Sequence, residues 1–143
     1  MNETPLIIPG LRKLYDGLRP LTYTLLRIMA AGMMMQFGFK KLFLTGVEPD
    51  LAHMQSLGLE PAIAWAYFVV SVEFFASLAV VIGLLTRPFA VVLLVLVTVM
   101  LATVLMPRGQ GYQRGLIWWA AFALIAVHGG GRYSIDRMIG KEF

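Results

Sequence analysis

The sequence predicts an all-α integral membrane protein folded as a four-helix bundle. Of its 143 residues, 59% are hydrophobic and only 14% are charged, whereas roughly a quarter of the residues in a soluble domain are charged. The apolar residues fall into four runs that proline, glycine and charged residues divide. A helix needs about 20 apolar residues to cross a hydrocarbon core of about 30 Å, so the chain has room for four spans and short loops.

The segment before the first span, residues 1–20, carries apolar and basic residues in a helical pattern. Leu11, Leu14 and Leu18 recur at spacings of three and four, and Arg12 and Arg19 lie between and beside them. This pattern favours a short helix on the membrane surface. An unstructured basic tail is the alternative, because so short a helix is marginal by itself.

Four spans follow within a transmembrane domain over residues 21–137. The runs cover about 21–44, 62–85, 89–106 and 112–129, and a backbone in lipid satisfies its own hydrogen bonds most readily as a helix. The fourth run is short for a span, so a re-entrant segment is its alternative. Three glycines end it, and Ser134 is placed to cap a short helix that begins after it. Residues 138–143 form a C-terminal tail.

The distribution of basic residues predicts that both ends of the chain are cytoplasmic. With four spans, the two termini and the second loop share one side, which holds more Lys and Arg than the other. That side carries Arg12, Lys13, Arg19, Arg87, Arg132, Arg137 and Lys141. The other side carries Lys40, Lys41, Arg108 and Arg114. The lipid bilayer and its anionic head groups account for these charges, so nucleic acid is not an expected partner.

The residue types exclude several kinds of chemistry. The chain has no cysteine, which excludes disulfides, thiolate catalysis and iron–sulfur ligation by this chain. Its two histidines, His53 and His128, are expected on opposite sides of the membrane. No cluster with metal-ligand spacing is present, so no metal site is predicted.

Two charged residues are expected inside the membrane, where a charge costs at least about 3 kcal/mol unless it is paired or solvated. Glu73 lies in the middle of the second apolar run, and Arg27 lies about two turns into the first. Glu73 is either a proton-accepting or ligand-binding group, or a structural link between helices. Arg27 either pairs with Glu73 or extends to the cytoplasmic head groups.

Helical spacing places Arg27 on a face that we expect to meet the second span. Ala31, Met34, Gly38 and Lys41 share that face, and its small residues permit close approach of another helix. The hypothesis is a polar pocket formed by Arg27, Glu73 and Ser77. Arg27 lies nearer the cytoplasm than Glu73, so contact between them requires an extended arginine, a water or a ligand.

Three groups of residues resemble the DoxX family of small bacterial membrane proteins. They are Leu26-Arg27 with Gly38 and Lys41-Leu42-Phe43, then Glu73 with the stretch 83–88, and finally Gly131-Arg132-Tyr133-Ser134-Ile135-Asp136-Arg137. One departure is Phe37, where family members often have histidine, so a role of that histidine does not carry over. The resemblance implies a four-helix, multi-pass protein of the bacterial cytoplasmic (inner) membrane. It also implies a link to oxidoreductase complexes that use quinones.

The first functional hypothesis is therefore a membrane subunit of a quinone-linked oxidoreductase system. Glu73 would handle a proton beside a quinone head group and Arg27 would tune its charge, while Ser77, Gly38 and Lys41 are the residues expected to contact the quinone. The redox centre would lie in a partner oxidoreductase subunit, so whether this chain is itself an enzyme stays open. The alternatives are a non-enzymatic scaffold or assembly partner, and a small transporter. Assembly with further copies of itself is also open.

Overall fold

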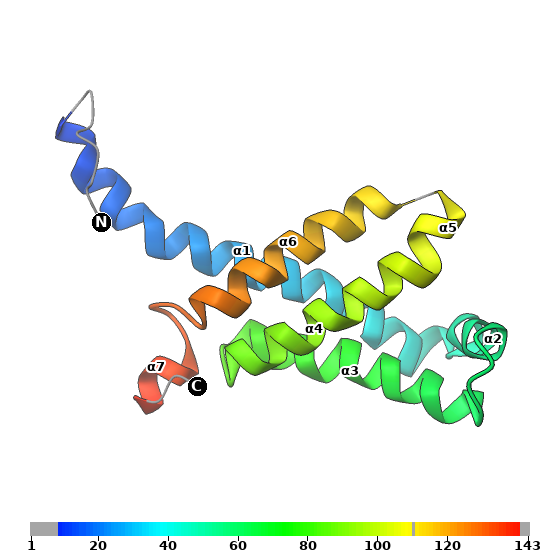
Figure 1. Ribbon diagram of the computed structural model, residues 1–143. Coiled ribbons are helices and arrows are strands. Elements are labelled where there is room, and N and C mark those ends of the chain that lie inside the picture. The colour runs from blue at the N-terminus through cyan, green and yellow to red at the C-terminus, as the bar shows by residue number, and fades with distance from the viewer. Residues whose placement is uncertain (1–8, 110, 141–143) are drawn as a thin grey trace.

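The computed structural model describes residues 9–109 and 111–140, and these residues are helical with short turns (Figure 1). A short 3-10 turn, η1 (Pro9–Leu11), precedes α1 (Arg12–Lys40), and a π-helical turn, η2 (Lys41–Thr45), continues α1. The short α2 (Glu48–Ser56) leads to α3 (Ala62–Ile82). No strand occurs among the described residues, which confirms the all-α prediction.

The second half of the chain repeats the pattern of long helices joined by short turns. Helix α4 (Thr86–Met100) continues through a second π-helical turn, η3 (Leu101–Leu105), into α5 (Met106–Arg108). Helix α6 (Tyr112–His128) precedes α7 (Ile135–Ile139), which Ser134 caps by accepting a hydrogen bond from the Arg137 backbone N–H at 3.3 Å. The cap predicted at Ser134 is thereby confirmed.

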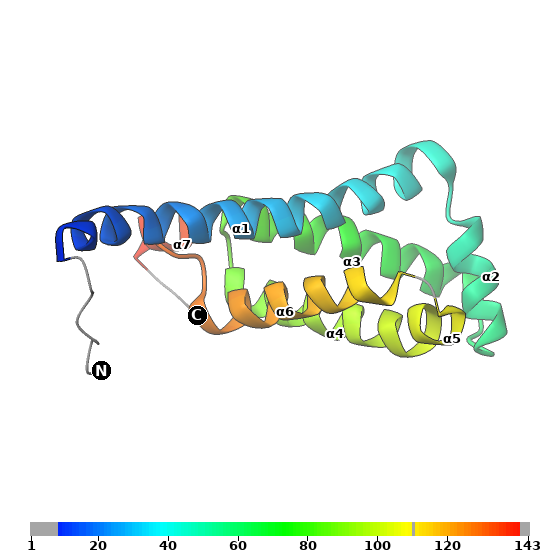
Figure 2. The ribbon, with the colours of Figure 1, turned by 90° about the horizontal axis from the view of Figure 1, so that it is seen from above.

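The N-terminal segment differs from the separate surface helix that the sequence suggested. Helix α1 runs without interruption from Arg12 through Pro20 to Lys40. The Thr24 hydroxyl donates to the carbonyl of Pro20 at 2.7 Å. Both views show the N-terminal part of α1 continuing past α7 and past the neighbouring ends of α3 and α6 (Figures 1 and 2). Residues 1–8 and the last part of the predicted tail, 141–143, lie outside the described residues.

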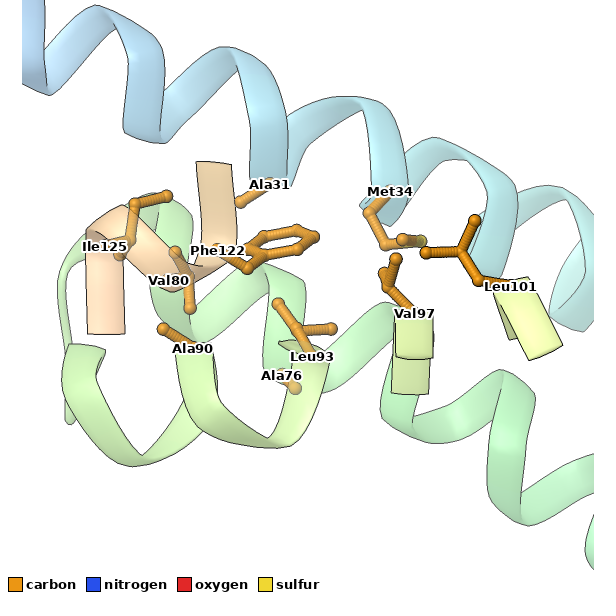
Figure 3. Close-up of a cluster of buried hydrophobic side chains, with 10 residues drawn as sticks. All are labelled: Ala31, Met34, Ala76, Val80, Ala90, Leu93, Val97, Leu101, Phe122 and Ile125. Atoms are coloured by element: carbon orange, nitrogen blue, oxygen red, sulfur yellow. The ribbon is translucent and has the colours of Figure 1, made fainter. Parts of the chain in front are cut away.

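The four long helices pack in the order α1, α3, α4, α6, and α6 also contacts α1. Their core consists of apolar side chains, from alanine to phenylalanine, that come from all four helices (Figure 3). It contains Ala31, Met34, Ala76, Val80, Ala90, Leu93, Val97, Leu101, Phe122 and Ile125. A second apolar cluster packs α2 against α3 and contains Val47, Met54, Ala62, Ala66 and Val70.

Large apolar side chains cover the outside of this core. Phe68, Ile117 and Val127 are among many that are exposed, and an extensive apolar surface is not expected in water. Two helices among the described residues are long and apolar enough to cross a membrane, Ala62–Ile82 and Thr86–Arg108. These two agree with the second and third predicted spans; the four-span arrangement and its orientation stay predictions.

Candidate functional site

An ion-paired cluster joins α1, α2 and α3 near the end of α1. Lys41 begins the π-helical turn, and its Nζ donates to both carboxylate oxygens of Glu73, at 2.9 and 3.1 Å. The same ammonium donates to Asp50 Oδ1 on α2 at 3.0 Å. A lysine ammonium has three donors, so these contacts use all of them. Lys41 is therefore the group that holds the two carboxylates together.

The cluster is largely shielded from solvent. The exposed fractions of the side chains are 5% for Glu73, 16% for Asp50 and 25% for Lys41. Charges in such a setting need opposite charges and hydrogen bonds to offset their desolvation. Two carboxylates nevertheless share one ammonium, and Asp50 Oδ2 is buried without a hydrogen-bond partner among the described residues. The cluster thus has room for one more proton or donor.

A cavity of about 190 Å³ lies beside this cluster, between α1, α3, η3 and α6. Lys41, Glu73 and Arg114 are its charged lining residues, and apolar side chains form most of the rest. The lining residues are Met34, Phe37, Lys41, Glu73, Met100, Leu105, Gly111, Arg114 and Trp118. The rings of Phe37 and Trp118 meet edge to face, with centroids 5.7 Å apart. An apolar cavity with a few convergent polar groups is typical of a small-molecule site.

Gly38 determines how closely α1 and α3 approach each other at this level. A Cβ atom on Gly38 would lie 2.7 Å from the backbone nitrogen of Phe74 and 2.9 Å from its Cα. The backbones therefore touch at this point, one turn from Lys41. The contact confirms that the face of α1 with small residues meets the second span. It also brings Lys41 within reach of Glu73.

Ser77 lies one helical turn from Glu73 on α3 and is completely buried. Its hydroxyl has no hydrogen-bond partner among the described residues, and it is not part of the cavity lining. Of the three residues predicted to contact a cofactor, Lys41 lines the cavity and Gly38 positions it.

Arg27 does not pair with Glu73, which was one of the two alternatives for it. Arg27 Nη1 donates to the carbonyl of Gly130 at 2.6 Å, and Nη2 donates to that of Tyr133 at 2.7 Å. The face assigned to Arg27 is correct, since its side chain is almost completely buried against the bundle. Its depth is the reason: Glu73 is level with Gly38, which lies eleven residues from Arg27, or about 16 Å along the helix. Arg27 therefore belongs to a different polar cluster.

That second cluster, which we call the C-terminal clasp (residues 129–137), ties the end of the chain to α1 and to the turn between α3 and α4. Asp136 accepts hydrogen bonds from the backbone N–H groups of Leu85, at 2.7 Å, and Thr86, at 2.9 Å. It also accepts one from the Thr86 hydroxyl at 2.8 Å. The Tyr23 hydroxyl donates to the carbonyl of Gly129. Most polar contacts of the clasp join a side chain to a main-chain group of another segment, so the clasp holds these segments together.

Electrostatics favour an ionised Asp136. Burial by itself raises the pKa of this carboxyl, but the hydrogen bonds from Thr86 and Leu85 and the charge of Arg27 outweigh burial and lower the pKa below its ordinary value. The carboxylate caps the first turn of α4, where Leu85 has a left-handed backbone (φ 47°) and provides no side-chain cap. A negative charge at a helix N-terminus is stabilising.

Sequence reasoning missed Asp50, Arg114 and Trp118. Asp50 was assigned to an external loop, because nothing in the residue pattern indicated that α2 folds back against α1 and α3. Arg114 was counted only among the basic residues that set the orientation, and Trp118 falls within the fourth predicted span, 112–129. Lys41 carried a usable signal, since it shares a helical face with Arg27 and Gly38. That spacing could have nominated it as the partner of Glu73.

Comparison with known proteins identifies the family. The family model described as DoxX matches residues 22–107, which is more than half of the chain. The chain belongs to the DoxX family. It is also 28% identical, over 134 residues, to the inner membrane protein YphA of Escherichia coli (strain K12), across 86% of this chain and 94% of that protein. No solved structure matches the chain.

The family assignment confirms the resemblance deduced from the sequence and makes this chain a small membrane protein. The matched DoxX range contains Lys41, Asp50 and Glu73. Arg114, Trp118 and the C-terminal clasp lie beyond it. The ion-paired cluster is thus inside the DoxX match, while one wall of the cavity is outside.

Proposed function

We propose that this DoxX protein is a membrane subunit of a quinone-linked oxidoreductase system. The observation that carries the proposal is the Lys41–Glu73 ion pair at the polar part of an aromatic-lined cavity. A quinone, when bound, supplies reversible transfer of electrons together with protons. The chain has no cysteine or metal-ligand cluster among its described residues, and the partner oxidoreductase subunit is proposed to hold the redox centre.

The residues of the cavity suit a quinone head group. Two of the three Lys41 donors go to the single carboxylate of Glu73, so one of them can turn to a quinone carbonyl oxygen, and Phe37 and Trp118 provide ring contacts. The cavity, at about 190 Å³, is smaller than the 300–1,000 Å³ typical of drug-sized sites. It therefore suits a single ring, with a hydrocarbon tail left in the bilayer.

Glu73 and Asp50 would hold and pass the proton that accompanies this chemistry. Glu73 lines the cavity, while Asp50 does not and is the more exposed of the two carboxylates. Lys41 contacts both within 3.1 Å. A proton taken up at Asp50 can replace one that Lys41 gives to Glu73, so the ammonium is restored. The proton route of Glu73 would therefore lead through Asp50 on α2, and not toward the C-terminal clasp.

The same proposal places the chain in the bacterial cytoplasmic membrane as a four-span bundle with both ends in the cytoplasm. Figure 1 supports this arrangement, since α7 lies at one end of the long helices and α2 and α5 lie at the other. Among the described residues, the end with α7 carries Arg12, Lys13, Arg19, Arg87, Arg132 and Arg137, against Lys40, Lys41, Arg108 and Arg114 at the other end. An excess of basic residues is typical of cytoplasmic loops.

The test is purification from the native membrane in mild detergent, followed by extraction and quantification of quinone. We expect quinone in near-stoichiometric amount with the wild-type chain and roughly tenfold less with Glu73→Gln, which corresponds to about 1.4 kcal/mol of binding. Glu48→Gln is the matched control, because it makes the same change at an exposed position of α2. Co-purifying proteins are identified in the same preparation.

Two results would contradict the proposal. One is a cofactor-free wild-type chain, and the other is equal quinone in the wild type and Glu73→Gln. A cofactor-free chain whose deletion lowers the abundance of a co-purifying protein would support the scaffold hypothesis instead. Substrate flux in liposomes that contain this chain alone would support transport.

A further inference from the structure

The N-terminal half of α1 extends beyond the helices that it packs against. Arg27 is buried where α1 meets the C-terminal clasp, and fifteen residues of α1, Arg12 to Leu26, precede it. These span about 22 Å. Helix α3, with 21 residues, already matches a hydrocarbon core of about 30 Å. Both ribbon views show the first turns of α1 running on past the other helices (Figures 1 and 2), while Tyr23, which donates to the Gly129 carbonyl, and the buried Thr24 still lie against the bundle.

The extension carries an apolar seam with the spacing of a coiled coil. Leucines and an isoleucine recur in steps of four, three, four and three, and each is between 40% and 53% exposed. The seam consists of Leu14, Leu18, Leu21, Leu25 and Ile28. Apolar residues repeating every 3.5 positions are the pattern with which two helices interlock side chains along a shared seam. The opposite face carries Arg27, which points into the bundle.

Charged residues of the extension lie off this seam. The positions that flank it are Tyr15, Gly17, Thr22 and Thr24, all uncharged. Asp16 and Arg19, whose side chains are 3.8 Å apart, lie away from the seam. Two copies placed seam to seam therefore bring no like charges together. Like charges at the positions that flank a seam are the usual obstacle to such pairing.

We propose that this seam binds the same seam of a second copy of this chain, in parallel. Copies inserted in one membrane share their direction, and a seam that continues into the first turns of the span requires a partner helix of that same direction. Binding of the seam to the membrane surface fits the structure less well than binding to a second copy. To lie flat on that surface, the extension would have to turn sharply at Pro20, whereas α1 continues through Pro20 as one helix.

Cysteine cross-linking tests this contact directly, because the chain has no cysteine of its own. Single substitutions Leu14→Cys, Leu18→Cys and Leu21→Cys are compared with Lys13→Cys and Asp16→Cys, which are neighbours off the seam. Each full-length variant is oxidised in its membrane and run on a non-reducing gel. We expect disulfide-linked dimer to form roughly tenfold more at the seam positions than at the controls. Unchanged thermal unfolding of Leu18→Cys verifies that the fold is intact.

A nitroxide label on the Leu18→Cys variant distinguishes a seam that contacts a second copy from a seam that contacts lipid. In the dimer, the label is protected from both lipid-soluble oxygen and a water-soluble relaxation agent. Strong relaxation by oxygen would show that the seam lies in lipid and would overturn the proposal. Equal cross-linking at seam and control positions, or cross-linking of Leu18→Cys to a different protein, would also overturn it.

Discussion

Lys41 is the residue on which the candidate site depends most. It is the shared partner of two carboxylates that come from different helices. Without it, Glu73 and Asp50 would face each other with no cation between them. Removing one member of a buried ion pair leaves an uncompensated charge. This destabilises a protein more than replacing the whole pair with apolar residues does.

Replacing Lys41 with methionine should therefore destabilise the protein by about 2 kcal/mol. The loss is smaller than that expected on breaking a completely buried ion pair, because Lys41 is partly exposed. The double variant Lys41→Met/Glu73→Gln should recover part of the loss, since it also removes a buried charge. Thermal unfolding in detergent, followed by tryptophan fluorescence, measures both. Lys40→Met is the control, because Lys40 is the exposed neighbour of Lys41. Equal losses in the two single variants would refute the role of Lys41.

At this scale, the sequence predicted which residues matter better than it predicted their partners. Glu73 was found because a carboxylate in a long apolar run must serve some purpose. Its partner was not identified because pairing depends on the depth at which two antiparallel helices meet. The backbone contact of Gly38 with Phe74 puts Lys41, which is one turn from Gly38, at the depth of Glu73, and the sequence alone did not establish that contact.

At the scale of helices, the contact at Gly38 fixes the register of α1 on α3. Gly38→Ala should push the two backbones apart and destabilise the protein by about 1–3 kcal/mol, as overpacking usually does. Gly32→Ala on the same helix is the matched control, since a Cβ there meets nothing within 4 Å. Thermal unfolding of both variants checks the prediction. Equal stability of the two would mean that α1 and α3 are not in contact at this point.

The C-terminal clasp also acts at this scale, because it joins α7 to the start of α4. Asp136→Asn should cost about 1–3 kcal/mol at neutral pH, through weaker hydrogen bonds to Leu85 and Thr86. Because the folded pKa of Asp136 lies below its ordinary value of about 3.9, its contribution is complete above that value. The contribution is lost as the pH falls through the folded pKa.

Unfolding measured between pH 7 and pH 3 should therefore show the wild type losing its advantage over Asp136→Asn only in acid, below about pH 4. Asp16→Asn, an exposed aspartate on α1, serves as the control and should match the wild type at every pH. A difference between wild type and Asp136→Asn that stays constant down to pH 3 would exclude the carboxylate as its source.

Helix boundaries were predictable where residues with fixed backbone preferences stand. The start of α3 after Pro61 and its end at Gly83, which adopts a left-handed backbone (φ 77°), follow from local chemistry. The continuity of α1 through Pro20 and the folding back of α2 did not follow. The position of α2 depends on contacts with other elements, through Asp50 and Met54.

On the scale of the whole molecule, the buried small side chains and the apolar exterior suit a bundle surrounded by lipid. Ala31, Ala66 and Ala90, one each from α1, α3 and α4, are completely buried, while larger residues such as Phe68 and Ile117 face outward. Small residues between helices are typical of membrane proteins, because they allow backbones to approach closely. What this pattern does not determine is which end of the bundle faces the cytoplasm.

Sided labelling decides the orientation and the number of spans together. A membrane-impermeant maleimide should label Ser56→Cys, on α2, in intact spheroplasts, and should label Met138→Cys, on α7, only after permeabilisation. Both positions are exposed in the folded chain, and there is no native cysteine to interfere. The reverse pattern would place both termini outside. Labelling of both positions from the same side would instead mean that residues 112–129 enter and leave the membrane on one side, which would turn the fourth span into a re-entrant segment.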